Sequence, residues 1–180
     1  MRKYLLALSG LLWAATPLSA KSSAFHTGPV FTEFGQVATI ETTMDIPADA
    51  SFAIAFDTAT RADVGEINRT LNSAARFINM HVEAGVPLDN MRVAVVVHGV
   101  SSLDLTRAEL FAARLDGAEN ANAAAIAELL DNNVQIILCG QTAAYYEIGV
   151  EDLLPGVDMA LSAMTAHALL QQNGFTLNPF

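Results

Sequence analysis

Two stretches of sequence decide the fold: Arg92-Val-Ala-Val-Val-Val-His98-Gly99 and Val134-Gln-Ile-Ile-Leu-Cys139-Gly140. Each is a short run of β-branched and aliphatic residues that ends in a residue capable of chemistry. Nearly continuous apolar runs of this length are typical of parallel strands, which are covered on both faces. Gly99 lets the chain turn tightly after the first run. We therefore expect both runs to be strands of a parallel sheet.

Strands and helices alternate on either side of these runs. Shorter apolar runs predict further strands at residues 51–56, 157–161 and 175–177, so that the sheet has about five strands. The clearest helix has apolar residues at helical spacing from residue 67 to 82, after the capping-box spacing of Asp63 and Glu66. Alternation of this kind implies βαβ units with right-handed crossovers. The predicted fold is a three-layer α/β sandwich with a mostly parallel sheet.

The first residues have the layout of a secretory signal peptide. Arg2 and Lys3 precede an apolar run over residues 5–15, and small residues follow it. The apolar run is shorter than the roughly 20 residues that span a bilayer, which argues against a permanent anchor. We interpret residues 1–20 as a signal peptide, with cleavage after a residue between 20 and 24.

Length and charge limit the remaining possibilities. The chain has 180 residues, which fits one domain at 51–180 preceded by an arm at 21–50 that is rich in turn residues. It carries 9 basic against 19 acidic residues, and phosphate binding needs a basic surface. We therefore expect a periplasmic protein with no nucleic-acid partner and, once the signal is removed, no association with the membrane.

Candidate site residues follow the predicted strands. In parallel sheets, ligands bind at the carboxyl ends of the strands, beside the N-termini of the following helices. Asp57, His98, Cys139 and Ser162 each follow one of four successive predicted strands. We predict Cys139 and His98 as catalytic residues, and as ligand-binding residues Gly99, Gly140, Gln141, Asp57 and Ser162.

Cys139 is the only cysteine, which excludes an internal disulfide and a cysteine cluster for zinc. A thiol between a strand and a helix N-terminus lies near free backbone N–H groups, which lower its pKa. The resulting thiolate can attack a sulfur donor and hold the product as a persulfide. Alternatively, Cys139 is a buried residue that ends an apolar strand, or it forms an intermolecular link. His98 could assist a thiolate on the neighbouring strand, or be satisfied by backbone carbonyls.

Other chemistries find little support in the sequence. His26, His81 and His167 are scattered, with no spacing typical of a zinc site, and we expect them at the surface. No phosphate-binding glycine motif is present. We therefore predict no metal and no cofactor.

Taken together, these segments resemble the DsrE/DsrF-like family, in particular its exported branch. The resemblance covers about residues 51–180 and rests on residues 93–99, 133–142, 152–157, 160–165 and 171–175. It implies an α/β fold with a parallel sheet and assembly into homotrimers or hexamers. In family members that relay sulfur, it also implies a persulfide on the cysteine that matches Cys139.

We thus expect a periplasmic protein that handles sulfane sulfur through a persulfide on Cys139, receiving it from or passing it to another protein. The main alternative is a noncatalytic oligomeric module that binds a small ligand or partner at the strand ends, with Cys139 structural. A weaker alternative is a metal or redox sensor that uses Cys139 with a histidine.

Overall fold

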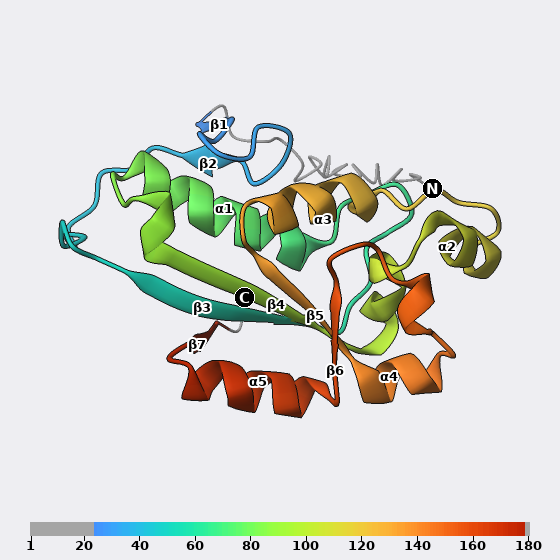
Figure 1. The fold of residues 1–180 in the computed structure, drawn as a ribbon. Helices are drawn as coiled ribbons and strands as arrows, with labels where there is room; N and C mark the ends of the chain where they lie inside the picture. The colour runs from blue at the N-terminus through green and yellow to red at the C-terminus, as the bar shows by residue number, and fades with distance from the viewer. Residues whose placement is uncertain (1–23, 179–180) are drawn as a thin grey trace, which may run out of the picture.

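A computed structural model describes residues 24–178 of the chain. Five parallel strands form one sheet in the order β6-β5-β4-β3-β7, with helices on both faces (Figure 1). The predicted α/β sandwich with a parallel sheet is confirmed. The strands are Phe52–Thr58 (β3), Met91–Val97 (β4), Gln135–Cys139 (β5), Asp158–Ala160 (β6) and Thr176–Asn178 (β7).

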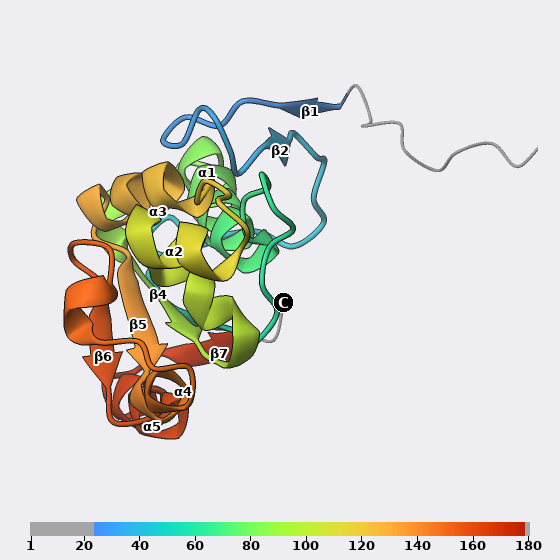
Figure 2. The ribbon, with the colours of Figure 1, turned by 90° about the vertical axis from the view of Figure 1, so that its right-hand side faces the viewer.

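The helices form the two outer layers. One face of the sheet is covered by α1 (Arg69–Glu83) and α3 (Asn122–Asp131), and the other by α4 (Gly140–Tyr145) and α5 (Ala163–Gln172), as Figures 1 and 2 show. The short helix α2 (Ala108–Arg114) follows a 3-10 helix over Gly99–Leu105. Two further 3-10 turns lie at Leu88–Asn90 and Val150–Asp152.

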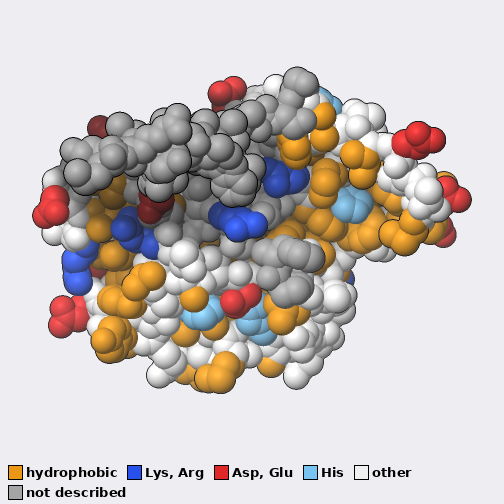
Figure 3. All heavy atoms as spheres, turned by 180° about the vertical axis from the view of Figure 1, so that it is seen from behind, with side chains coloured by type: hydrophobic (Ala, Val, Ile, Leu, Met, Phe, Trp, Pro, Cys, Tyr) orange, Lys and Arg blue, Asp and Glu red, His pale blue; other side chains and the backbone are white. Residues whose placement is uncertain are grey.

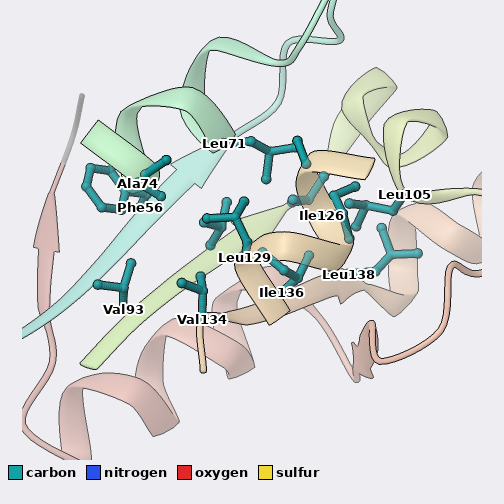
Figure 4. Close-up of a cluster of buried hydrophobic side chains, with 14 of the residues drawn as sticks. Phe56, Leu71, Ala74, Val93, Leu105, Ile126, Leu129, Val134, Ile136 and Leu138 are labelled. Carbon is teal, nitrogen blue, oxygen red and sulfur yellow. The ribbon is translucent and has the colours of Figure 1, made fainter. Parts of the chain in front are cut away.

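Each face of the sheet has its own core. The larger core lies under α1 and α3 and buries branched and aromatic side chains (Figure 4), among them Phe56, Leu71, Val93, Ile126, Leu129, Ile136 and Leu138. The core under α5 is smaller and contains Ala55, Ala94, Val96, Ala166, Leu170 and Phe175. Successive strand residues point to opposite faces, so Asp57 points to the α5 face because its neighbour Phe56 faces the larger core.

The start of α1 differs from the prediction. Asn68 caps this helix, with its side-chain oxygen 2.9 Å from the N–H of Thr70. Asp63 and Glu66 instead close a turn, in which the Glu66 N–H bonds to the Asp63 carbonyl at 3.0 Å. The expected capping box is therefore wrong, because hydrogen bonds from distant parts of the chain fix Asn68 as the cap.

Residues 24–50 lie against α1. Here β1 (Phe25–His26) pairs antiparallel with β2 (Val37–Ala38). Asn79 of α1 is fully buried, and its side chain bonds to the N–H and the carbonyl of Phe31 and to the carbonyl of Gly35. One buried amide therefore fixes this segment to the helix.

The predicted signal peptide at 1–20 lies outside the described residues. Between residues 24 and 178, no helix has both the length and the apolar character needed to cross a membrane.

Candidate functional site

Three of the predicted site residues lie at one edge of the sheet. Asp57 is the second-last residue of β3, His98 follows β4 and Cys139 ends β5. Val97 is paired with Leu138, so His98 and Cys139 come one step later on adjacent strands. Both have extended backbones, with φ −147° for His98 and φ −70°, ψ 114° for Cys139. Their side chains therefore continue the strand alternation onto the face covered by α4 and α5.

The sulfur of Cys139 lies in a cradle of hydrogen-bond donors. The N–H groups of Gln141 and Thr142, at the start of α4, and the N–H of Ala163, at the start of α5, donate to it together with the Thr142 hydroxyl. Burial alone would raise the pKa of this thiol, which is only 6% exposed. The hydrogen bonds outweigh burial and hold the pKa of Cys139 below its usual range. The thiolate is thus the form that this cradle favours.

Gly99 connects the loop after β4 to this cradle. Its N–H lies 3.3 Å from the Thr142 hydroxyl oxygen, which accepts the hydrogen bond and directs its own proton to Cys139. Gly99 has φ +58°, and a Cβ here would lie 3.0 Å from the carbonyl oxygen of Ala59. Both facts require glycine.

Gly140 makes the cradle geometrically feasible. A Cβ at this position would lie 2.5 Å from the carbonyl oxygen of Ala160, so only glycine lets β5 turn this close to the end of β6. The close approach brings the N–H of Ala163 to the sulfur of Cys139. Gln141 has an exposed side chain that donates to the carbonyl of Leu161 at 3.2 Å.

Ser162 lies in the same region with its hydroxyl already engaged. It is the N-cap of α5, accepting a hydrogen bond from the Thr165 N–H at 3.0 Å. The residue is 6% exposed, and its hydroxyl also bonds to that of Thr165. The structure places Ser162 as a residue that orients α5, and hence the N–H of Ala163.

Asp57 binds two histidines at once. Its Oδ2 lies 3.0 Å from Nε2 of His98, and its Oδ1 lies 2.7 Å from Nε2 of His167. Burial would raise the pKa of this carboxyl, but the hydrogen bonds from His167 and His98 lower it further than burial raises it. On the face opposite to that of Figure 1, two histidines lie beside an acidic side chain at the surface (Figure 3).

Of the three histidines expected at the surface, His26 is exposed, whereas His81 and His167 are half-buried. The side chain of His167 is 16% exposed and faces the sheet from α5. It shares this inner face with Ala163, Ala166 and Leu170, a helical spacing from which its direction could have been inferred. His81 packs between aromatic rings on α1 and β3, whereas His26 is exposed and pairs with Glu83 at 2.9 Å.

A buried polar network supports the loops at this edge, and sequence reasoning missed it. Asp104 is 1% exposed, and its Oδ2 accepts hydrogen bonds from the Asn68 amide at 2.7 Å and the Ala62 N–H at 3.0 Å. The Asn68 N–H in turn donates to Asn122 at 2.7 Å. Burial raises the pKa of Asp104 above its usual range. In the part of the chain that the structure covers, no three or more His, Cys, Asp or Glu side chains are grouped to hold a metal ion.

Comparison with solved structures identifies the same fold. The protein of unknown function MTH1491 from Methanobacterium thermoautotrophicum matches with a TM-score of 0.52 at 19% identity, over 72% of this chain and 100% of its own. The ychN protein from E. coli matches with a TM-score of 0.51 at 15% identity, over 72% of this chain and 99% of its own. At these identities the likeness concerns the fold alone. No functionally curated protein matches the sequence.

The family comparison agrees with the resemblance noted in the sequence. A family model matches residues 50–179, which include every candidate site residue named above. The chain therefore belongs to the DsrE/DsrF-like family.

Proposed function

We propose that this protein handles sulfane sulfur in the periplasm through a persulfide on Cys139. The observation that carries the proposal is the cradle of three backbone N–H groups and the Thr142 hydroxyl around the sulfur. Such donors stabilise negative charge on sulfur, and a thiolate is the nucleophile in sulfur exchange. The family membership and the fold support the proposal.

The transfer is an exchange between sulfur atoms. The thiolate of Cys139 attacks the outer sulfur of a donor persulfide, R–S–SH, and forms a new S–S bond. The S–S bond of the donor breaks, and its inner sulfur leaves as a thiolate with the electron pair. Passing the sulfur to an acceptor thiolate is the reverse reaction on a new partner, and neither direction needs an external oxidant.

The surface beside the cradle offers a place for a donor or acceptor protein. Leu161 and Met164 are 72% and 80% exposed, and they flank Ala163 in the sequence. Exposed apolar side chains next to a reactive group favour contact with another protein. We also propose, from the family resemblance, that the protein forms a homotrimer or hexamer, which a native mass measurement would test.

A second candidate function is a binding module in which Cys139 is structural. The burial of Cys139, 6% exposed at the end of an apolar strand, favours this alternative. In that case Cys139→Ser would leave ligand or partner binding unchanged.

The test is sulfur uptake by the mature protein. Purified protein is treated with inorganic polysulfide, desalted and examined by intact mass, with Cys139→Ser treated in parallel. We expect the wild type to gain sulfur that dithiothreitol removes, and the variant to gain none. An unmodified wild-type thiol, or equal uptake by the variant, would overturn the proposal.

A further inference from the structure

We propose that Asp57 and His167 form a positioning pair that holds His98 as the acid–base group for Cys139. This inference rests on the proposed sulfur exchange and assigns proton transfer within it. His167 touches neither Cys139 nor His98 through any hydrogen bond of the described structure, so its role is to fix the carboxylate that fixes His98.

The hydrogen bonds define the tautomers of both imidazoles. Each oxygen of Asp57 faces one Nε2, at 3.0 Å for His98 and 2.7 Å for His167. An ionised carboxylate can only accept hydrogen bonds, so both Nε2 atoms carry a proton. In each neutral ring, Nδ1 is then the basic nitrogen.

The two Nδ1 atoms lie in different environments. Nδ1 of His167 is buried, and no residue between 24 and 178 bonds to it. Within this range, His167 thus has a single hydrogen-bonding contact through its ring, the one from Nε2 to Asp57. The side chain of His98 is 34% exposed, and its Nδ1 has no hydrogen-bond partner among the same residues. His98 is thus the ring whose Nδ1 is open to a reactant.

His98 is also the ring nearest to the thiol along the sheet. Because Val97 is paired with Leu138, His98 and Cys139 occupy the next positions of adjacent strands and face the same side. Neighbouring strands of a sheet lie about 4.7–4.9 Å apart, a separation that an imidazole side chain can bridge. The Nε2 bond to Asp57 leaves Nδ1 of His98 available to Cys139 in the proposed exchange.

Helix α5 contributes both to the cradle around Cys139 and to the hydrogen bonds of Asp57. The N–H of Ala163 in its first turn bonds to Cys139, and His167, one turn later, bonds to Asp57. Four titratable side chains contribute to the arrangement: Asp57 from β3, His98 after β4, Cys139 from β5 and His167 from α5. Asp57 also lines a pocket with charged side chains of the loop after β3 and the start of α1, namely Arg61, Asp63, Glu66 and Arg69. The segment of α4 at the cradle contributes only uncharged donors, Gln141 and Thr142.

The proton follows a closed path in the exchange. Nδ1 of His98 takes the proton of the Cys139 thiol, and the thiolate forms a bond to the outer sulfur of R–S–SH. The donor S–S bond breaks, and the departing R–S⁻ takes the proton from Nδ1 to become R–SH. The products are the Cys139 persulfide and the donor thiol, with His98 neutral again, so atoms and charge balance without another reactant.

The experiment has two readouts on the full mature chain. The first is the pH profile of sulfur uptake from glutathione persulfide in four variants: His98→Gln, His167→Gln, His167→Leu and the control His26→Gln. Glutamine can donate its amide N–H to Asp57 in place of Nε2, whereas leucine cannot. We expect His98→Gln to slow uptake about 100-fold, as for loss of a general acid–base group. His167→Leu should slow it about tenfold and His167→Gln only about twofold, since the donor is kept.

The second readout is nitrogen NMR of the wild-type imidazoles between pH 5 and 8. We expect each neutral ring to carry its proton at Nε2, because each Nε2 faces a carboxylate oxygen of Asp57. This measurement needs no variant and decides the case even if the His167 variants do not fold.

The outcomes separate the inference from the proposed function. If the wild type takes up no sulfur, the proposed function fails, whatever the tautomers are. If it takes up sulfur but His167→Leu keeps the wild-type rate and pH profile, the positioning role is wrong. A proton on Nδ1 rather than Nε2 of neutral His98 would also overturn the inference.

Discussion

Nε2 of His167 lies 2.7 Å from Oδ1 of Asp57, although 110 positions separate the two residues in the chain. This contact connects the last helix to the strand end beside His98. Asp57 is therefore a shared acceptor, because its second oxygen accepts a hydrogen bond from His98. His98 in turn follows the strand next to the one that ends at Cys139. The residues that could take part in a reaction thus come from β3, the end of β4, β5 and α5.

Removing the charge of Asp57 should weaken its hydrogen bonds to His98 and His167. In Asp57→Asn, one carboxylate oxygen becomes an NH₂ group that faces an Nε2–H, so one hydrogen bond is lost. We expect the free energy of unfolding to fall by about 1–2 kcal/mol, as for a half-exposed hydrogen bond to a charged group. Urea denaturation at pH 7 measures this. An unchanged midpoint would contradict the contacts described for Asp57.

Asp57 should also make the free energy of unfolding depend on pH. The folded pKa of Asp57 lies below its ordinary value of 3.8. Its contribution to stability is therefore complete above that value and is lost as the pH falls through the lower, folded pKa. Denaturation series from pH 7 downward should show wild type losing more stability below about pH 4 than Asp57→Asn. Parallel curves would show that the carboxyl is not perturbed.

The contribution of Asp104 to stability should change with pH in the opposite direction to that of Asp57. Burial raises its folded pKa above the ordinary value of 3.8, so its ionisation disfavours the folded state. This contribution to stability is present at low pH and is lost as the pH rises from 3.8 through the folded pKa. Asp104→Asn, which keeps an oxygen for the Asn68 amide, should remove that loss between pH 4 and 7. A variant curve that falls as steeply as wild type across this range would disprove the assignment.

The hydroxyl of Thr142 should be needed for a reactive thiol. Thr142→Val keeps the backbone N–H and the shape but deletes one donor to Cys139, which raises the pKa of the thiol. We expect alkylation by iodoacetamide at pH 7 to slow about 3–10-fold, the effect of one hydrogen bond of about 1 kcal/mol. Thr142→Ser should restore most of the rate, and Thr32→Val, at an exposed position, should have no effect. Equal rates in Thr142→Val and wild type would exclude the hydroxyl from the cradle.

Gly140→Ala tests the close approach that builds the cradle. A methyl group would lie 2.5 Å from the carbonyl oxygen of Ala160, so the backbone must shift and draw the Ala163 N–H away from the sulfur. We expect a loss of about 1–3 kcal/mol in stability and slower alkylation of Cys139. In the matched control, Gly149→Ala, the three atoms nearest to the methyl belong to the flexible side chain of Glu151. Similar results for both variants would mean that the approach at Gly140 is not needed.

Sequence patterns predicted the sheet and the placement of Cys139 because both depend on local features. The apolar run at 92–97 and the run that ends at Cys139 have the length and composition of buried parallel strands. Parallel strands place their carboxyl ends at one edge, so Asp57, His98 and Cys139 were bound to lie close together.

The remaining features depend on contacts between distant segments. Asn68 replaces the expected cap because Asp104 and Asn122 hold it. His167 turns inward because α5 packs against this face of the sheet, from which its ring bonds to Asp57. A helical spacing shows which residues share a face with His167, but it does not show which strand that face will meet.

The most direct test of the central claim is the mass of the protein isolated from its native host cells without reductant. We predict a fraction that carries one additional sulfur on the peptide containing Cys139, removable by dithiothreitol and absent from Cys139→Ser. A Cys139 that is wholly free and unmodified, in a protein recovered from host cells that contain sulfane sulfur, would contradict the claim.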